Sequence, residues 1–576
     1  MGYTAFVAPV TAGLALALAY GLFSWMNKSG AGTYKMKEVA GRIRTGAMMF
    51  LKREYIAMAV TIAVLSAAIW VSLNLLTAAL YIAGAFFSAL SCFFGMRAAI
   101  KGNVRAANAA EVSGVNKALK VAFRSGAVMG LCVTGLGLLG VGTVFAVFGA
   151  LTAAEIVCGF GLGASSAALL ACAGGGIYTK AAVLGSDIFE SYTLAMISAI
   201  ILAVNIPGAV PRFGGGFDLN PVVGSLFPLL ISSIGLMTSM LTIMFVRGRD
   251  NTNPASSLNT AAFVGKAIVI ICSFFLSRSL FGGYNCAVAA TAGIITGMAL
   301  GKVTEVYTSE SHRRAKMIAD QQSTDPASAV VSRFRTGMAS TVGFILCIAL
   351  CILAADSFAG LYGISIAAVG MLSTTGMSLA SGAFGHISGS AGGIAEAAQL
   401  SERARQITGI LDAAGKTAAA KGRAFARGST VLTSIALFVV YSQVAGLRTV
   451  NLLDPLVIAG LAIGAMLPFG FGAMGMKSNG KTSIKGMLTL GLIAIIVPFA
   501  VGILAGVKTL GGMLAGAITA GVLVATMLDN AGALASDMTG GLFKDNAGPF
   551  INILIKFIAI VAIVFSGIFI KTGGIL

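Results

Sequence analysis

The sequence predicts an all-helical integral membrane protein, and three observations support that prediction. Of the 576 residues, 57% are hydrophobic and only 10% are charged, and the mean hydropathy is +0.93. A water-soluble fold must cover its outside with polar residues, which this composition does not supply. Apolar runs of about 20 residues recur from end to end, the length a helix needs to cross a bilayer. The 75 glycines are typical of membrane helices that pack closely through small residues.

The apolar runs predict about sixteen transmembrane helices in a single polytopic domain, residues 1–576, with no separate soluble domain. We read the first run as a span and not as a signal peptide, because it lacks a basic n-region and many similar runs follow it. Only helices are expected, since unpaired backbone groups cannot face lipid. In chain order, the predicted spans are 4–25, 55–75, 77–96, 126–148, 152–173, 187–207, 222–246, 260–277, 284–301, 337–355, 361–379, 428–446, 453–473, 485–505, 509–528 and 547–570.

The loops between spans are short, and two are longer than the rest. Residues 302–335 suggest a helical extension broken at Thr324-Asp325-Pro326, and residues 380–427 are rich in glycine and serine before they become amphipathic. Helices that extend a turn or two beyond the membrane would suit both.

Basic residues alternate from loop to loop and predict the topology. The rich stretches are Lys28–Arg53, Arg97–Arg124, Arg247–Arg249, Lys302–Arg335, Arg403–Arg427 and Lys477–Lys485. By the positive-inside rule these loops are cytoplasmic, so both termini are expected on the opposite, extracytoplasmic side. We expect a bacterial plasma membrane, with a vacuolar-type membrane as the alternative.

The net charge of +19 is explained by the same loops, which would lie beside anionic lipid. No aromatic-interleaved basic patch or zinc spacing points to nucleic acid, so the expected surroundings are membrane lipid. The eight cysteines lie almost wholly in apolar runs, and we interpret them as packing residues without a metal site or a disulfide framework.

Charged residues inside spans are the first candidates for function, because burying them in a membrane is costly unless they are paired. Asp187, Glu190 and Ser191 share one face at the start of a span. Lys556 lies inside the last span and is expected to pair with Asp187 first and Glu190 second. The residues alone leave two interpretations open: a static ion pair between helices, or part of an ion path. Lys266 lies near a span end, where its side chain can reach the interface.

A second set of polar residues is predicted at the cytoplasmic ends of the helices. Lysines beside glycine-rich turns can hold a phosphate through ammonium and backbone N–H groups. A magnesium-dependent phosphoryl-transfer site would also need several converging carboxylates, and the neighbouring loops supply few. The set is Lys180, Lys416, Lys421, Asn530, Lys544 and Asp545.

These residues lie in motifs that resemble the membrane-integral inorganic pyrophosphatases, a family of proton- or sodium-pumping proteins with sixteen transmembrane helices. The likeness covers nearly the whole chain. The motifs are GAMMFLKREY (46–55), NVRAANAAEVSGVNKALKVAFRSGAVMGL (103–131), GFGLGASSAAL (159–169), GGGIYTK (174–180), GSDIFESY (185–192), GKVTEVYTSE (301–310), LYGISIAAVGMLSTTG (361–376), AGGIAEAAQL (391–400), TGILDAAGKTAAAKGRAFA (408–426) and FKDNAGPFINILIK (543–556).

The resemblance implies site residues, and the chain departs from the family at many of them. Family members carry an acid-rich segment after GGGIYTKAA, which binds Mg–pyrophosphate and positions the attacking water; here Leu184 is followed directly by GSDIFESY. Replacements stand at Gly382, Gly389 and Gly541 for aspartates, at Lys416 for an asparagine, and at Cys172 for an arginine. A lysine pair after Asn530 is also missing. The resemblance implies Mg²⁺ as cofactor, and these departures predict that this chain lacks its ligands and the catalytic residues.

Other family positions are retained. The resemblance implies a residual substrate site at Lys180, Lys544 and Asp545, and an ion gate at Asp187, Glu190, Ser191 and Lys556. It also implies a homodimer, and pyrophosphate or phosphate as ligand. We expect a family member that has lost efficient hydrolysis and keeps an ion gate. The alternatives are an active pyrophosphate-energised cation pump with a trimmed site, and a non-catalytic partner subunit of an active pump.

Overall fold

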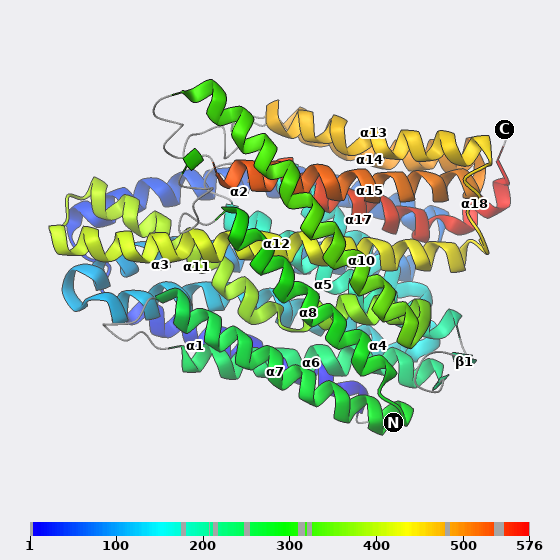
Figure 1. Ribbon diagram of the computed structural model, residues 1–576, viewed down its shortest axis with the longest axis horizontal. Coiled ribbons are helices and arrows are strands. Elements are labelled where there is room, and N and C mark those ends of the chain that lie inside the picture. The colour runs from blue at the N-terminus through cyan, green and yellow to red at the C-terminus, as the bar shows by residue number, and fades with distance from the viewer. Residues whose placement is uncertain are drawn as a thin grey trace.

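Long helices running side by side build the whole molecule (Figure 1). The computed structural model describes residues 4–173, 180–206, 208–210, 217–246, 254–308, 317–318, 325–477, 484–534 and 547–574. Within these ranges the prediction of an all-helical membrane fold is confirmed, apart from one short two-stranded sheet.

The elements follow the predicted runs in order. Before the membrane domain proper, a short 3₁₀ turn covers Thr4–Phe6. The helices are α1 (Val7–Lys28), α2 (Tyr34–Ser72), α3 (Leu75–Ser113), α4 (Val115–Ala173), α5 (Lys180–Asn205), α6 (Pro221–Phe245), α7 (Pro254–Phe281), α8 (Asn285–Thr308), α10 (Pro326–Ser373), α11 (Thr375–Ala397), α12 (Glu402–Val444), α13 (Pro455–Lys477), α14 (Ile484–Leu504), α15 (Gly506–Ala533), α17 (Gly548–Val564) and α18 (Ser566–Thr572).

Two of these helices each contain two spans. Gly149 breaks α4 with φ 73° and ψ 173°, and Ala359 and Gly360 break α10 in the same way. Twelve described helices are long and apolar enough to cross a membrane, and the bent pair α17–α18 makes a thirteenth. Dividing α4 and α10 at their breaks, counting the short second part of α10 together with α11 as one span, and adding the shorter α14 gives sixteen spans in the described part of the chain, in agreement with the sequence.

A small sheet departs from the helix-only expectation. Strands β1 (Gly208–Val210) and β2 (Phe217–Leu219) pair antiparallel, with Ala209 opposite Asp218. They connect α5 to α6 at the end of the bundle, beyond the apolar runs. The helix-only expectation was based on the cost of unpaired backbone groups in lipid. Because each strand supplies hydrogen-bond partners for the other, the backbone of this sheet avoids that cost.

The long segment 380–427 is helical nearly throughout. It consists of the end of α11, a turn after Ala397, and the first half of α12 from its N-cap Ser401, whose side chain accepts from the N–H of Ala404. The expected helical extensions are therefore confirmed here. Of the other long segment, α8 continues to Thr308 and α10 begins at Pro326, and most residues between them lie outside the described ranges.

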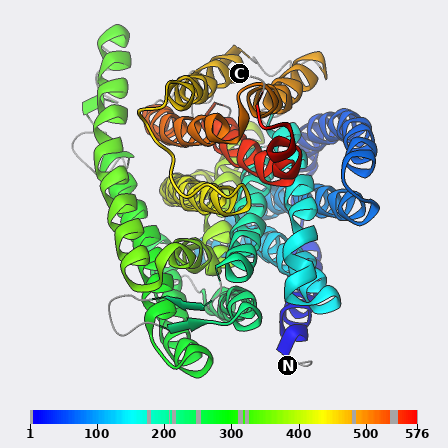
Figure 2. The ribbon, with the colours of Figure 1, turned by 90° about the vertical axis from the view of Figure 1, so that its right-hand side faces the viewer.

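The start of α1 and the end of α18 lie at the same end of the bundle, together with β1 (Figure 1). This follows from an even number of spans. The end-on view places the blue N-terminal helices and the green helices of the middle of the chain on opposite flanks (Figure 2). Which end faces the cytoplasm stays a prediction from the basic loops.

Small residues set how closely the helices approach. A Cβ atom built on Gly293 of α8 would lie 1.9 Å from the carbonyl oxygen of Ala367 on α10, and one on Gly464 of α13 would lie 1.9 Å from that of Met513 on α15. No side chain fits there, so the backbones touch, as is common where membrane helices associate. The eight cysteines are free, and all but Cys272 and Cys347 are buried.

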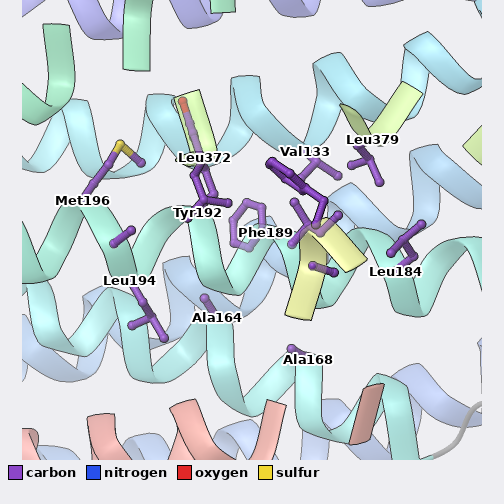
Figure 3. Close-up of a cluster of buried hydrophobic side chains, with 14 of the residues drawn as sticks. Val133, Ala164, Ala168, Leu184, Phe189, Tyr192, Leu194, Met196, Leu372 and Leu379 are labelled. Atoms are coloured by element: carbon purple, nitrogen blue, oxygen red, sulfur yellow. The ribbon is translucent and has the colours of Figure 1, made fainter. Parts of the chain in front are cut away.

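Helix α5 lies at the centre of the bundle. Its apolar side chains Phe189, Tyr192 and Leu194 are almost completely buried and pack among residues of the neighbouring helices (Figure 3). Figure 3 shows Ala164 and Ala168 of α4 close beneath α5. This packing excludes water from α5, so any charge that α5 carries must find its partners inside the protein.

A buried ion cluster in the centre of the bundle

Helix α5 presents Asp187, Glu190 and Ser191 on one face, because positions i, i+3 and i+4 are neighbours on a helix. Lys556 of α17 faces them and has no exposed surface. The four residues predicted as an ion gate are therefore brought together by the fold.

Lys556 holds the cluster through several contacts. Its Nζ donates to Oδ1 of Asp187 at 2.6 Å, to the backbone carbonyl of Asp187 at 3.0 Å, and to Oγ of Ser191 at 2.8 Å. The same Nζ lies 3.0 Å from Oε2 of Glu190. The sequence-based pairing of Lys556 with both acids is thus observed.

The remaining oxygens contact hydroxyl groups. Ser165 of α4 donates to Oε1 of Glu190. The Ser191 hydroxyl donates to the carbonyl of Asp187 at 3.0 Å and lies 3.5 Å from that of Thr430 on α12. Hydroxyl oxygens are suitable ligands for a proton or a small hard cation.

The charges in this cluster do not balance. Asp187 and Glu190 are two carboxylates, and Lys556 is their one ion-pair partner among the described residues. All three are at most 2% exposed. An uncompensated charge buried this deeply is very costly. The cluster therefore favours one additional positive charge, either a proton on a carboxylate or a bound monovalent cation.

Glu190 is the carboxylate best placed to take that charge. Its Oε2 is buried and lies close to Lys556, but it accepts no hydrogen bond of good geometry from the described residues. A buried acceptor without a hydrogen bond is unusual in native proteins. This oxygen has lone pairs left for a proton or a cation.

A second buried pair was missed in the sequence. Arg427 of α12 donates to Oδ2 of Asp529 at 2.7 Å and to Oδ1 of Asn530 at 3.0 Å, and Asn530 donates to Ser340 of α10 at 2.7 Å. Arg427 falls within a predicted cytoplasmic basic stretch, and Asp529 is not among the predicted site residues. Arg427 directly precedes the predicted span 428–446, and Asp529 directly follows the predicted span 509–528. These positions were the only sequence features that could have indicated the pair.

Glu54 of α2 was also missed. Its side chain is 4% exposed, and its Oε1 has no hydrogen-bond partner within the described part of the chain. In the sequence Glu54 directly follows Lys52 and Arg53, so it resembled part of a solvated basic stretch. In the structure it lies on a face of α2 that points into the protein.

The residual substrate site can be placed only in part. Lys180 begins α5, but its side chain lies outside the described residues, as do Lys544, Asp545 and Gly541. Lys416 lies at the exposed surface of α12, with its Nζ 3.5 Å from Asp412. A substrate site formed by Lys180, Lys544 and Asp545 therefore stays a prediction.

Two of the positions where family aspartates are replaced are described, and both are closely packed. A Cβ on Gly382 of α11 would lie 3.3 Å from Leu184 and 3.6 Å from the Cα of Gly422 on α12. A Cβ on Gly389 would lie 3.0 Å from Oδ1 of Asp412. A side chain at either position would therefore meet a neighbour at its Cβ, Leu184 of α5 at Gly382 and Asp412 of α12 at Gly389.

These residues do not fit a magnesium centre. Mg²⁺ loses its water shell reluctantly and needs converging carboxylates to hold it with a phosphate. In the described ranges no group of three or more His, Cys, Asp or Glu side chains has an arrangement that could hold a metal ion.

The fold and the buried cluster define a polytopic membrane protein with two carboxylates and one lysine buried at its centre. The family model described as inorganic H⁺ pyrophosphatase matches residues 13–188, 182–483 and 479–537. The chain belongs to this family of membrane-bound pyrophosphatases, as its motifs indicated.

Relatives match over nearly their whole length. The chain is 39% identical to a putative K⁺-stimulated pyrophosphate-energized sodium pump of Clostridium tetani, covering 98% of this chain and 97% of the relative. It is 32% identical to a K⁺-insensitive pyrophosphate-energized proton pump of Methanosarcina mazei, covering 99% of each. With the K⁺-stimulated sodium pump of Thermotoga maritima the identity is 28%, covering 96% and 98%.

The alignments also show that this chain is shorter than its relatives. The match to the Clostridium protein extends over 658 aligned positions, whereas this chain has 576 residues. The family match comes in three segments, and the first two overlap at residues 182–188. The acid-rich segment that the sequence predicts to be missing would follow Leu184, within that overlap.

Proposed function

We propose that this chain binds and conducts a monovalent cation at the Asp187–Glu190–Lys556 cluster and has lost efficient pyrophosphate hydrolysis. The observation that carries the proposal is the charge excess of the cluster: two buried carboxylates share one lysine. H⁺ and Na⁺ are the two cations to test, because the relatives are named as proton pumps or sodium pumps.

The loss of hydrolysis is supported by a separate set of observations. Two segments of the family match meet and overlap at 182–188, and α11 and α12 lie close together where a Cβ on Gly422 would be 3.1 Å from the Cα of Gly382. Without carboxylates to hold Mg²⁺ and a base to take a proton from water, the rate of hydrolysis is expected to fall by many orders of magnitude. The proposal includes a homodimer in a bacterial plasma membrane, as the family resemblance implies.

The test uses purified protein in sealed liposomes. An imposed membrane potential should drive cation uptake without pyrophosphate, first assayed for H⁺ and then for Na⁺. Asp187→Asn should abolish uptake, and Glu402→Gln, at the exposed start of α12, should leave it unchanged. Equal uptake by the wild type and Asp187→Asn would contradict the proposal.

A pyrophosphate-energised pump with a trimmed site is the second candidate, favoured by similarity to named pumps over the whole length. Mg²⁺-dependent phosphate release from pyrophosphate, lost in Lys180→Ala and accompanied by cation uptake, would establish this function. If the wild type shows neither hydrolysis nor uptake, the third expectation, a non-catalytic partner subunit of an active pump, becomes the one to pursue.

A further inference from the structure

Away from the buried ion cluster, three lysines from three helices line one cavity of about 290 Å³. Lys266 comes from α7, Lys302 from α8 and Lys421 from α12, and α11 closes the remaining side with Ser378 and Ser381. The cavity shares no residue with the Asp187–Glu190–Lys556 cluster. It lies where α7 begins and α8 ends, which is the end of the bundle opposite β1 (Figure 1).

One acid is not enough to neutralise these lysines. Glu305 lies 2.9 Å from the Nζ of Lys302 and 3.1 Å from that of Lys421. Lys421 also donates to Oδ1 of Asn259 at 3.3 Å. Counting the three lysines and Glu305, the described residues of this cavity carry three positive charges and one negative charge. Two positive charges are therefore in excess.

Lys266 is the unsatisfied member of the group. It makes no hydrogen bond or ion pair with the described residues, and its neighbours along the cavity wall include Leu258, Phe263 and Phe425. From the sequence, the Lys266 side chain was expected to reach the membrane interface; in the structure it lines this cavity. An ammonium among apolar side chains loses hydration without a counter-charge in return, so it favours an anion beside it.

The chemistry of the lining selects the class of anion. Three ammonium groups offer charged donors, and the amide of Asn259 and the hydroxyl of Ser378 add neutral ones. Phosphate oxygens accept several such bonds at once, and charge-assisted bonds of this kind are the strong ones. Pockets for drug-sized ligands have volumes of about 300–1,000 Å³. This cavity is at the lower end of that range, so it has room for a phosphate group and only a few further atoms.

We propose that this cavity, lined by Lys266, Lys302 and Lys421, binds a phosphate-bearing anion. The phosphate comes either from an anionic lipid headgroup or from free phosphate in solution. The apolar wall formed by Leu258 and Phe263, with Phe263 59% exposed, gives acyl chains a surface beside the headgroup. Basic pockets between membrane helices bind acidic lipid headgroups in this manner.

The experiment measures binding to the full-length, delipidated protein in zwitterionic micelles. One arm titrates inorganic phosphate, and the other titrates phosphatidylglycerol against phosphatidylcholine at the same total lipid. Thermal midpoint and intrinsic fluorescence report binding. The variants are Lys266→Gln, Lys266→Arg as the charge-conserving rescue, Lys302→Gln as a second lining variant, and Lys117→Gln as an exposed control on α4.

The wild type should bind in one arm, which identifies the source of the phosphate. Lys266→Gln and Lys302→Gln should each weaken that binding about tenfold, the effect of one lost charged hydrogen bond. Lys266→Arg should restore binding and Lys117→Gln should not change it. Without ligand, Lys266→Gln should melt no lower than the wild type, because the variant removes an unpaired charge.

Two results would overturn the proposal. One is the absence of binding to the wild type in both arms. The other is binding by Lys266→Gln as tight as that of the wild type. Because no step involves cation uptake or hydrolysis, these outcomes are independent of the proposed function.

Discussion

Replacing Lys556 by methionine tests whether the buried cluster is held by charge. Methionine approximates the length of the lysine side chain and removes only the ammonium. Asp187 and Glu190 then remain buried with no cation beside them, and the excess of negative charge in the cluster rises from one to two. Protons or solution cations must enter, or the helices must separate.

The distances set the size of the effect. For unit charges 2.6 Å apart, the separation of Lys556 Nζ and Asp187 Oδ1, Coulomb's law with an effective dielectric constant of about 20 gives about 6 kcal/mol. Part of that is offset by the desolvation of the ions. Removing one partner of a buried pair generally costs about 3–5 kcal/mol, and we expect a loss of stability in that range.

The neutralising variants of the acids should behave differently. Asp187→Asn leaves Lys556 opposite Glu190, and Glu190→Gln leaves it opposite Asp187 at 2.6 Å. In each case the cluster becomes neutral, so the loss should be smaller than for Lys556→Met. The triple variant Lys556→Met, Asp187→Asn, Glu190→Gln carries no charge and should recover part of the stability.

The assay is thermal unfolding of the purified protein in detergent, compared at one protein and lipid concentration. Lys556→Met should have the lowest midpoint of thermal unfolding, and the triple variant should have a higher one. Asp187→Asn and Glu190→Gln should melt at higher temperatures than both. If Lys556→Met melts as high as Asp187→Asn, or if the triple variant melts below Lys556→Met, the charge argument is refuted and packing alone determines the stability.

Three further predictions use the same unfolding measurement. Arg427→Leu should cost about 3–5 kcal/mol, because it removes one partner of a buried ion pair whose atoms are 2.7 Å apart; no loss would mean that the pair is not a structural link. Gly382→Asp should destabilise the protein by crowding α12 and should not restore Mg²⁺-dependent phosphate release, whereas Gly392→Asp, with open space around its Cβ, should be tolerated. Gly293→Ala should cost about 1–3 kcal/mol by overpacking, whereas Gly301→Ala on the same helix should be neutral or stabilising; equal effects would refute the close helix contact.

Much of the fold could be predicted because the membrane constrains it. A span must be apolar for about 20 residues and must form its hydrogen bonds internally, so each run of the sequence corresponds to a helix. The breaks at Gly149 and Gly360 fall in the gaps between predicted spans. The β1–β2 pair was not predicted, since three-residue strands leave no periodic pattern.

The candidate site could be predicted where a charge lies inside an apolar run. Lys556, Asp187 and Glu190 stand out because charges are rare in such segments. Arg427 and Glu54 were overlooked because basic residues are common at the ends of spans. A charge there can face lipid headgroups or the protein interior, and the sequence looks the same in both cases.

The sequence by itself determined the class of protein, the number of spans and the residues of the central ion cluster, because hydrophobic length and intramembrane charge are local properties of the chain. Only the tertiary structure decided what those charges contact. The excess carboxylate at Glu190, the closed α11–α12 seam at Gly382, and the three-lysine cavity around Lys266 all depend on distances between helices far apart in sequence. Such distances follow from how side chains of different helices pack, which no single segment encodes.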